Sequence, residues 1–409
     1  MKTNSIRWTV LILAAWTAAT NARAAAPGGG RGAKRLLVSF VEGTPRSERE
    51  KAVRAMGLAV ADDLDAVSVT AVESPADGDA RAAILALKNP KILTVEEDVY
   101  RRWLLDPPAS LQQSPLPAVE DALRGLGRLR GSALPPGGRV PWGVARVDAP
   151  KAWPTGRGEG VKVAVIDTGV DCGHPDLRCD FSSGANFVEP GLRPMDDNEH
   201  GTHVAGTIAG RGAAGGVLGV APRATLLPVK VLDAEGAGRL SDIIKGILWA
   251  ADAGADVINM SLGGDIDSPA MERAVEAALA AGVVVVCAAG NSGPDPDTVG
   301  YPAGYPGVIA VAASDNRDRV ALFSSRGPAV ALIAPGVNIT STAPGGGVRT
   351  LSGTSMASPH VAGLAALAVQ RGAKGPSGVR RALIRASSPL PGAAPVEDGA
   401  GLPDAGRLP

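Results

Sequence analysis

The chain has 409 residues, and its 41 basic and 41 acidic side chains give a formal net charge of zero at pH 7. Aromatic residues make up only 3% of it, whereas glycine and proline are frequent, with 53 and 33 residues. The balanced charge argues against a nucleic-acid-binding surface and against a polybasic membrane patch. The length is sufficient for two or three domains, or for one large domain with additions.

Residues 1–24 have the pattern of a secretory signal peptide. Lys2 and Arg7 precede an apolar run over 8–19, and Ala22 and Ala24 form an A-x-A cleavage pattern. The run is shorter than the roughly 20 residues of a membrane span, and no later stretch matches it in length and purity. We therefore expect a mature protein that is exported, either to the cell envelope or out of the cell, and that is not anchored in the membrane.

Export would place the three cysteines in an oxidising compartment. In an oxidising compartment, Cys172 and Cys179 can close a short loop, which leaves Cys287 unpaired. Cys287 lies in an apolar, strand-like run, where a free thiol fills space as a small hydrophobe more often than it acts in catalysis. A zinc site is not expected, because the cysteines lack paired spacing and no nearby histidine completes a tetrahedron.

Residues 34–104 predict a small α+β unit. Apolar runs favour strands over 36–41, 66–72 and 92–95, and helices are expected over 47–56 and 79–87. The order strand, helix, strand, helix, strand is typical of a ferredoxin-like unit. Residues 105–139 contain six prolines and read as a linker.

From residue 140 to 409 the pattern becomes α/β. Apolar runs predict strands over 161–166, 226–232, 257–260, 283–288 and 308–312, and helices are predicted over 200–210, 240–253 and 269–281. This alternation predicts a doubly wound, mainly parallel sheet with helices on both faces. In such sheets, ligands bind beyond the carboxyl ends of the strands.

Polar residues occur at those strand ends. Asp167, Ser261 and Asn291 each follow a predicted strand, and His200 opens a predicted helix. Ser355 precedes an Ala-rich helical run over 361–369, where it is either a helix cap or a nucleophile exposed to backbone amides. An acid, an imidazole, an amide donor and a serine are the groups that acyl transfer requires.

Four blocks of sequence resemble the signatures of subtilisin-like serine peptidases: Asp167-Thr-Gly, His200-Gly-Thr-His, Ala-Ala-Gly-Asn291 and Gly-Thr-Ser355-Met-Ala-Ser-Pro-His. The resemblance covers about residues 140–408. It implies a serine endopeptidase that works through an acyl-enzyme, with His200 as base, Asp167 as its orienting acid, Ser355 as nucleophile and Asn291 as oxyanion donor. The segment 34–104 resembles the family's inhibitory propeptide more weakly, which implies an inhibitor in cis that is later cleaved away.

Other residues compete for these roles. In the family's motif the first histidine is the base, which favours His200 over His203. His360 reads as a structural helix residue, and His174 as structural or as close to the substrate. Asp171 is a weaker rival of Asp167, because it lies further from the strand end.

The resemblance also implies how substrates bind. Ser261, Leu262 and Gly263 would form one wall of the cleft and pair with an extended peptide. Gly300 would floor a deep, uncharged pocket for a large apolar residue before the scissile bond. Leu240 and Ile243 would line a further apolar pocket with Leu262, although Ile243 reads equally well as a core residue.

No cofactor is required for this chemistry, and calcium is the one metal to consider. Asp176 matches a calcium-ligand carboxylate of the family, but the loop 210–216 that should complete the site contains no Asn or Asp. Calcium prefers six to eight oxygen ligands, so the usual tight site is not expected, and a weaker carbonyl site around 303–308 is the alternative.

Two other functional classes agree less well with the sequence. A catalytically inactive relative that acts as a binding protein would be expected to lack one of the four polar residues, and none is missing. An esterase or lipase is disfavoured, because Ser355 lacks the G-x-S-x-G elbow and the chain order of the three groups differs. The expected partners are therefore protein or peptide substrates and the chain's own propeptide.

Overall fold

The computed structural model describes residues 34–74, 89–104, 107, 138–213 and 216–409. The expected signal peptide, the expected helix over 79–87 and most of the Pro-rich segment lie outside the described residues. Within the described part, no helix has the length and apolar character needed to cross a membrane.

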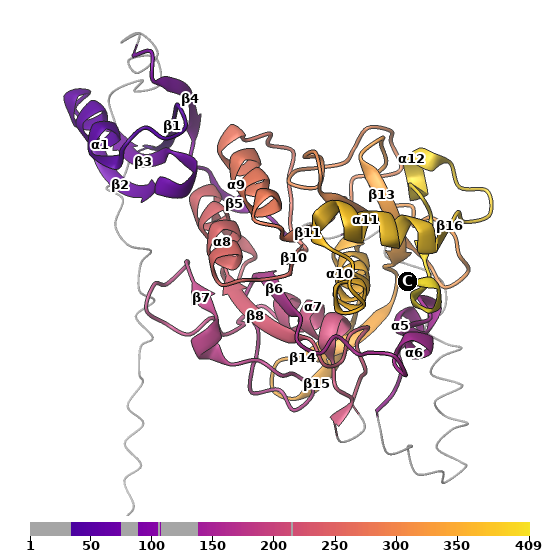
Figure 1. Cartoon of the computed structure of the whole chain (residues 1–409). Helices are drawn as coiled ribbons and strands as arrows, with labels where there is room; N and C mark the ends of the chain where they lie inside the picture. Colours follow the sequence, from indigo (N-terminus) through magenta and orange to yellow (C-terminus); the bar gives the residue numbers. More distant parts are fainter. Residues whose placement is uncertain (1–33, 75–88, 105–106, 108–137, 214–215) are drawn as a thin grey trace, which may run out of the picture.

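Most of the described chain is organised around one parallel sheet, whose seven strands lie in the order β13-β12-β11-β10-β6-β8-β7 (Figure 1). The strands are β6 (Lys162–Asp167), β7 (Ala185–Asn186), β8 (Thr225–Lys230), β10 (Val257–Met260), β11 (Val284–Ala288), β12 (Ile309–Ser314) and β13 (Val330–Pro335). Every neighbouring pair runs parallel. This confirms the doubly wound α/β fold that the strand–helix alternation predicted.

Helices cover both faces of this sheet. On one face lie α7 (His200–Ala209) and α10 (Thr354–Gln370), and on the other lie α8 (Leu240–Asp252) and α9 (Pro269–Ala280). Successive strand residues point to opposite faces, so Val163 and Val165 join the core beneath α7 and α10, whereas Ala164 and Ile166 join the core beneath α8 and α9. Burial on both faces explains why these strands are continuous apolar runs.

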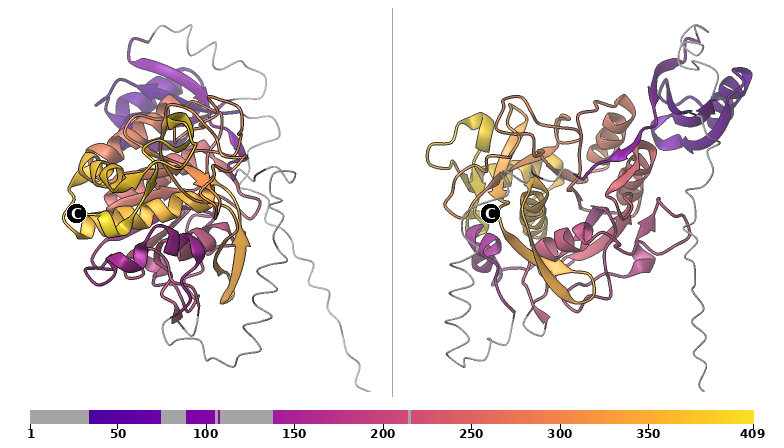
Figure 2. Two further views of the ribbon diagram at one scale, coloured as in Figure 1. Left: turned by 90° about the vertical axis from the view of Figure 1, so that its right-hand side faces the viewer. Right: turned by 180° about the vertical axis from the view of Figure 1, so that it is seen from behind.

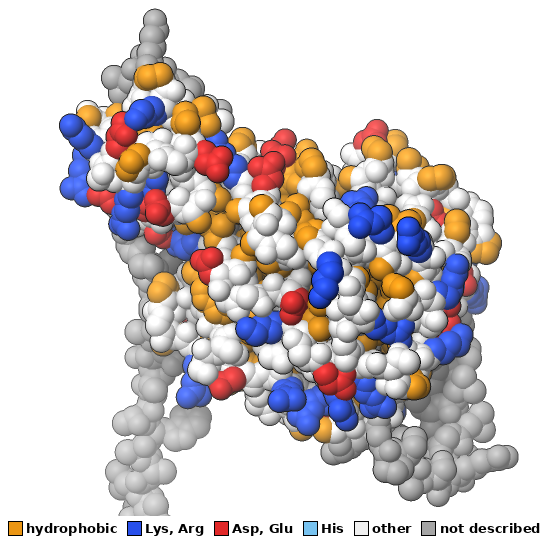
Figure 3. Space-filling model, viewed as in Figure 1, with side chains coloured by type: hydrophobic (Ala, Val, Ile, Leu, Met, Phe, Trp, Pro, Cys, Tyr) orange, Lys and Arg blue, Asp and Glu red, His pale blue; other side chains and the backbone are white. Residues whose placement is uncertain are grey.

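Shorter elements complete this domain. A hairpin of β14 (Ile339–Ala343) and β15 (Gly347–Leu351) leads into α10. The remaining elements are α5 (Trp142–Arg146), α6 (Ala149–Ala152), β9 (Ala237–Arg239), α11 (Gly375–Ala386), β16 (Ser387–Ser388), α12 (Pro395–Asp398) and β17 (Leu402–Pro403). Basic and acidic side chains are interspersed on the face drawn in Figure 3, as the balanced composition predicts.

The amino-terminal unit is an antiparallel sheet in the order β2-β3-β1-β4. Its elements are β1 (Lys34–Phe40), α1 (Arg46–Ala55), β2 (Ala59–Leu64), β3 (Val69–Ser74) and β4 (Ile92–Glu97). Strand β2 was not expected, because its sequence ends in two aspartates and a leucine and lacks a clear apolar alternation. The strand expected over 66–72 begins later, since 65–67 form a 3₁₀ turn. The ferredoxin-like arrangement stays a prediction.

Strand β5 (Tyr100–Arg102) leaves this unit and pairs antiparallel with β9 of the large domain (Figure 2). Just before it, Asp98 accepts hydrogen bonds from the backbone N–H and the hydroxyl of Ser241, both at 2.9 Å. Glu96 accepts from the N–H of Ala270 at 3.0 Å. These two carboxylates therefore meet the amino-terminal ends of α8 and α9, where unpaired N–H groups and the helix dipole favour negative charge.

The cysteines are arranged as the sequence suggested. Cys172 and Cys179 form a disulfide across seven residues of the loop that follows β6. Cys287 is a buried free thiol on β11, and burial raises the pKa of this thiol. Such a thiol is poor in thiolate at neutral pH and is suited to packing.

Candidate active site

Two of the expected site residues are directly paired at the carboxyl end of the sheet. Asp167 is the last residue of β6 and is fully buried, and His200 is the first residue of α7. The Asp167 Oδ1 and His200 Nδ1 atoms are 2.8 Å apart. The same Oδ1 accepts the backbone N–H of Thr168 at 2.8 Å. A buried carboxylate on Nδ1 fixes the imidazole so that Nε2 is the nitrogen available for proton transfer.

Ser355 is the second residue of α10, at the helix end where backbone N–H groups are unpaired. Its hydroxyl donates to the carbonyl oxygen of Ser261 at 3.0 Å, and its own carbonyl accepts from the Ser261 hydroxyl at 2.8 Å. The helix includes Thr354–His360 ahead of the apolar run, which places Ser355 at the start of a helix as expected. The serine is therefore inside the first helical turn.

The amide of Asn291 is oriented by Thr354, the residue before Ser355. Its Oδ1 accepts from the backbone N–H and from the hydroxyl of Thr354, both at 2.9 Å. A Cβ atom built on Gly353 would lie 3.3 Å from Asn291 Nδ2 and 3.7 Å from the Ser355 nitrogen. Two nitrogen donors thus border one small space that glycine leaves open, which is the geometry that a developing oxyanion needs.

Strand β5 and the residues after it lie along two segments that we call the cleft walls, 236–239 and 261–264. The Trp103 nitrogen donates to the Gly236 carbonyl at 2.9 Å, and the Gly263 nitrogen donates to the Trp103 carbonyl at 3.0 Å. Further along, Pro107 Cδ lies 3.8 Å from the Cβ position of Gly353. Residues 100–103 of the chain therefore lie between the two cleft walls, and Pro107 lies close to Gly353, two residues before Ser355.

The other expected substrate residues lie in the apolar core that contains Trp103 or beside the cleft wall 261–264. Leu240, Ile243 and Leu262 are buried in the same apolar cluster as the Trp103 side chain. The Gly300 nitrogen donates to Ala289 O at 3.0 Å, and a Cβ on Gly300 would lie only 2.7 Å from the Gly264 carbonyl oxygen. A side chain at 300 would thus press on a cleft wall, which explains the need for glycine there.

The remaining three histidines are bound to backbone atoms. His203 Nε2 lies 2.9 Å from Ile339 O, His360 Nδ1 lies 2.9 Å from Met356 O, and His174 Nε2 lies 2.9 Å from Gly347 O. Burial lowers the pKa of His203 to about 3 and that of His360 to about 4, so both are neutral at physiological pH. Each fits a structural role.

Asp171 is also separate from His200. Its carboxylate accepts the backbone N–H groups of Gly173 and Gly345, both at 2.9 Å. It therefore ties the disulfide loop to the β14–β15 hairpin.

The surroundings of Asp176 do not suit a tight calcium site. This carboxylate is 1% exposed, and its Oδ2 accepts the backbone N–H of Val217 at 2.8 Å. The loop backbone packs so closely that a side chain at Gly216 would collide with the carboxylate. Oδ1 is buried without a hydrogen-bond partner, but among the described residues no group of three His, Cys, Asp or Glu side chains converges to hold a metal. In the described part of this loop, which leaves out residues 214 and 215, Asp176 thus already accepts a backbone N–H where calcium would need an oxygen ligand.

Several residues that support the site were missed in the sequence. Thr354 orients Asn291, and the Ser358 hydroxyl donates to Asn259, whose amide donates to the Ser261 hydroxyl. The contacts of Thr354 with Asn291 and of Ser358 with Asn259 join residues that are far apart in the sequence, so no local pattern predicts them. The one available signal was the polar Asn259 inside an otherwise apolar strand.

Comparison with known proteins gives a consistent result. The model of the subtilase family matches residues 158–401. Subtilisin E of Bacillus subtilis (strain 168) is 51% identical over 236 residues, which are 57% of this chain and 61% of that protein. A subtilisin of Bacillus pumilus and subtilisin BL of Lederbergia lenta are each 50% identical, over 57% of this chain and 85% of their own length. The match thus spans about three fifths of subtilisin E and most of the other two.

Proposed function

Because this chain belongs to the subtilase family, we propose that it is a serine endopeptidase with Asp167, His200 and Ser355 as its catalytic triad. The observation that carries the proposal is the 2.8 Å contact between Asp167 and His200 at the carboxyl end of β6. It is supported by Ser355 at the amino-terminal end of α10, within the first helical turn.

The proposed chemistry is acyl transfer in two steps. The Ser355 oxygen attacks the peptide carbonyl carbon while His200 Nε2 takes the hydroxyl proton. The tetrahedral intermediate breaks its C–N bond, and His200 gives the proton to the leaving amine. Water then repeats the sequence on the ester, which releases the acid and restores the serine. Asp167 holds the imidazole and stabilises it once it is protonated.

Two donors would stabilise the negative oxygen of the intermediate, the Asn291 side-chain amide and the Ser355 backbone N–H. Their positions beside Gly353 support this role. The amide needs no reorganisation during the reaction, because Thr354 already fixes its other end.

We propose that substrates bind as extended peptides along Ser261–Gly264 and the facing wall. The support is the chain's own segment, which already makes such contacts through Gly236 and Gly263. Gly300 and the apolar side chains of Leu240 and Leu262 favour large apolar substrate residues, with Gly300 at the floor of the pocket before the scissile bond.

The same contacts support the proposal that residues 34–104 are an inhibitor in cis. A strand that occupies the cleft walls excludes substrate until the chain is cut near Leu104 or within 105–139. Together with the pattern of residues 1–24, this describes an exported zymogen with a signal peptide, a propeptide and a peptidase domain over 140–409.

The test of the catalytic assignment is mutation with activity on a peptide substrate. Ser355→Ala and His200→Ala should each lower kcat by roughly a millionfold, to the residue left by oxyanion stabilisation and binding. An inactive binding protein would show no hydrolysis in the wild type. If His203→Ala abolished the activity and His200→Ala retained it, the assignment of the base would be wrong.

The test of maturation is the intact mass of the secreted protein. Wild type should lose the segment up to Leu104 or beyond, and Ser355→Ala should accumulate uncut at that point. Equal cutting of both forms near Leu104 would show that another protease does it.

A further inference from the structure

Another carboxylate near the site, that of Asp196, has no role in the chemistry described above. It is 5% exposed and accepts five hydrogen bonds. Its Oδ1 accepts from the Thr168 hydroxyl (2.8 Å) and from the nitrogens of Asn198 (3.0 Å) and Glu199 (3.1 Å). Its Oδ2 accepts from the nitrogen (2.8 Å) and the hydroxyl (2.6 Å) of Thr202. The carboxylate therefore joins the turn before α7, the first turn of α7 and the residue after Asp167.

This arrangement replaces the ordinary cap of the helix that begins with His200. The N-cap residue is Glu199, which has a left-handed φ of +90° and provides no side-chain cap. Asp196 and Thr168 supply the missing acceptors instead, because the Gly201 nitrogen donates to the Thr168 hydroxyl oxygen at 3.0 Å. The first turn of α7 is thus fixed by residues that lie outside the helix.

Thr168 is the point where the two halves of the site meet. It directly follows Asp167, and its hydroxyl oxygen accepts from Gly201, which directly follows His200. The Thr168 hydroxyl therefore links the residue that follows Asp167 to the residue that follows His200. A small displacement of Thr168 changes the distance between the Asp167 carboxylate and the His200 ring.

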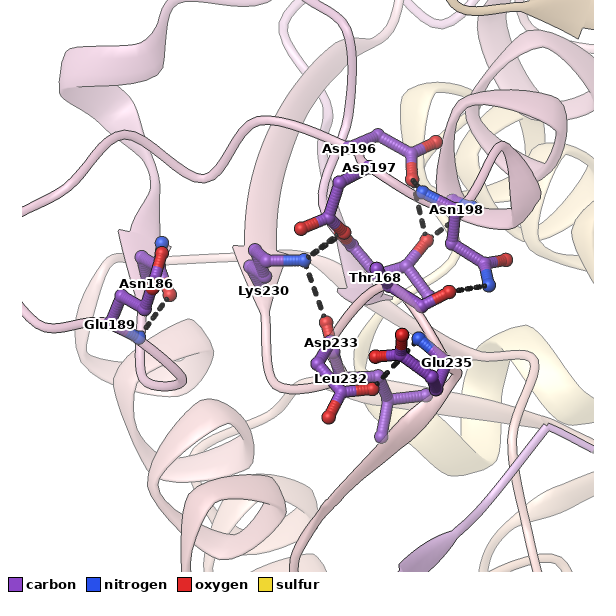
Figure 4. Close-up of polar contacts among 12 residues, drawn as sticks. Thr168, Asn186, Glu189, Asp196, Asp197, Asn198, Lys230, Leu232, Asp233 and Glu235 are labelled. Atoms are coloured by element: carbon purple, nitrogen blue, oxygen red, sulfur yellow. Dashed lines mark hydrogen bonds and ion pairs between the residues drawn. The ribbon is translucent and has the colours of Figure 1, made fainter. Parts of the chain in front are cut away.

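Lys230 holds the same threonine from the neighbouring strand. It is the last residue of β8 and lies in register with Asp167 of β6. Its Nζ is buried and donates to the carbonyl oxygens of Thr168 and Leu232, both at 2.8 Å, and to Asp197 at 2.6 Å. Figure 4 shows the ammonium group between Asp197 and the Leu232 carbonyl, with Asp196 and Thr168 beside it.

We propose that Asp196 and Lys230, acting through Thr168, are positioning residues that hold Asp167 and His200 in hydrogen-bonding distance. The inference rests on the proposed triad. Displacement of a reacting group by about 1 Å can cost roughly a hundredfold in rate, so a small relaxation of this linkage should be visible in kcat. Neither residue belongs to the cleft walls 236–239 and 261–264, so KM should change little.

The first experiment compares full-chain variants on one peptide substrate. Thr168→Val removes the hydroxyl at nearly constant volume and should lower kcat by about ten- to a hundredfold. Thr168→Ser restores the hydroxyl and should recover most of that loss. Asp196→Asn and Lys230→Met should behave as Thr168→Val does. The matched control is Asp398→Asn, because Asp398 is equally buried and accepts the Leu390 nitrogen far from the site.

The second experiment does not depend on activity. In full-chain Ser355→Ala, the proton between His200 Nδ1 and Asp167 should give a low-field NMR resonance. Thr168→Val and Asp196→Asn should shift or broaden it, and Asp398→Asn should leave it in place. An inactive wild type would refute the proposed function, and the NMR comparison would then decide the positioning role by itself. An unchanged resonance in both folded variants, or losses confined to thermal stability, would overturn the positioning role.

Discussion

At the scale of single residues, the site depends on side chains whose orientation is fixed by hydrogen bonds to neighbouring residues. Asn291 illustrates this, because both contacts of its Oδ1 are made to Thr354, next to the nucleophile. The amide nitrogen thereby lies beside Gly353, where Pro107 and the Ser355 nitrogen also approach.

Asn291→Ala should therefore lower kcat by about 10²–10³ with little change in KM, since the lost donor acts on the oxyanion and not on the bound substrate. Steady-state kinetics on one peptide would show the split. Asn186→Ala is a suitable control, because the Asn186 amide donates to Arg193 O on the opposite edge of the sheet. A rise in KM alone would argue that Asn291 serves binding.

The residues that carry chemistry could be proposed from sequence, and those that position them could not. The chemistry-bearing residues each belong to a short sequence motif at the end of a strand or the start of a helix: Asp167, His200, Asn291 and Ser355. Asp196 stands in no such motif and reads as one of several acidic residues in a loop. Four of its five hydrogen bonds are made to residues within six positions, and the one from Thr168, which joins β6 to the start of α7, forms only when these elements pack together.

At the scale of elements, the amino-terminal unit completes a helix of the large domain. The N-cap residue of α8, Arg239, offers no side-chain acceptor. The first two N–H groups of the helix, those of Leu240 and Ser241, donate instead to Val99 O and to the Asp98 carboxylate, both at 2.9 Å. Hydrogen bonds to a charged group contribute about 1.5–3 kcal/mol each.

Asp98→Asn should thus weaken docking of this unit by about tenfold or more. In full-chain Ser355→Ala, hydrogen exchange at the Ser241 amide would measure it, and protection should fall. Glu50→Gln is the matched control, because the Glu50 carboxylate accepts from Arg46 and Arg54 of its own helix. Equal protection in all three proteins would contradict the capping role.

Glu96 should make docking of the amino-terminal unit depend on pH. Burial raises its pKa above the ordinary value of 4.5, so the docked state binds a proton more tightly than the undocked state. Its contribution to docking is therefore fully present below pH 4.5 and declines as the pH rises through the raised pKa. Glu96→Gln should flatten this dependence when exchange at Ala270 is followed against pH. A dependence that persisted in the variant would assign it to another group.

Elements with strong periodicity were predicted well, and those defined by tertiary contacts were not. The strands and helices expected between 161 and 312 match β6 and β8 to β12 and α7 to α9 within about two residues, apart from the short β9. Strands β13 to β15 were missed. The start of α10 close to Ser355 was predicted, although glycine, serine and proline weaken the local helix signal there. Packing of α10 against α7 and against β6 and β10 to β13 favours the helix.

At the scale of the whole molecule, the stability of the large domain should depend little on calcium. A tight site occupied at a hundred times its Kd would add about 2.7 kcal/mol, which corresponds to several degrees in Tm. Because Asp176 faces an amide donor, we expect a shift of less than about 2 °C between chelator and millimolar calcium, on the scale of roughly 2–4 °C per kcal/mol. Thermal unfolding of Ser355→Ala, which cannot digest itself, is the measurement. A larger shift would show that the protein holds calcium through other oxygen ligands.

The burial of Trp103 gives the chain an internal optical signal. This indole is fully buried, and its Nε1 donates to Gly238 O at 2.9 Å, whereas Trp142, Trp153 and Trp249 are only partly buried. When the segment leaves the cleft walls, Trp103 alone should pass from an apolar environment into water. Its emission should then move to longer wavelength during maturation in the wild type, and should stay constant in Ser355→Ala and in Trp103→Phe. Zymogen conversion could thus be timed by fluorescence in the unlabelled protein, without any added substrate.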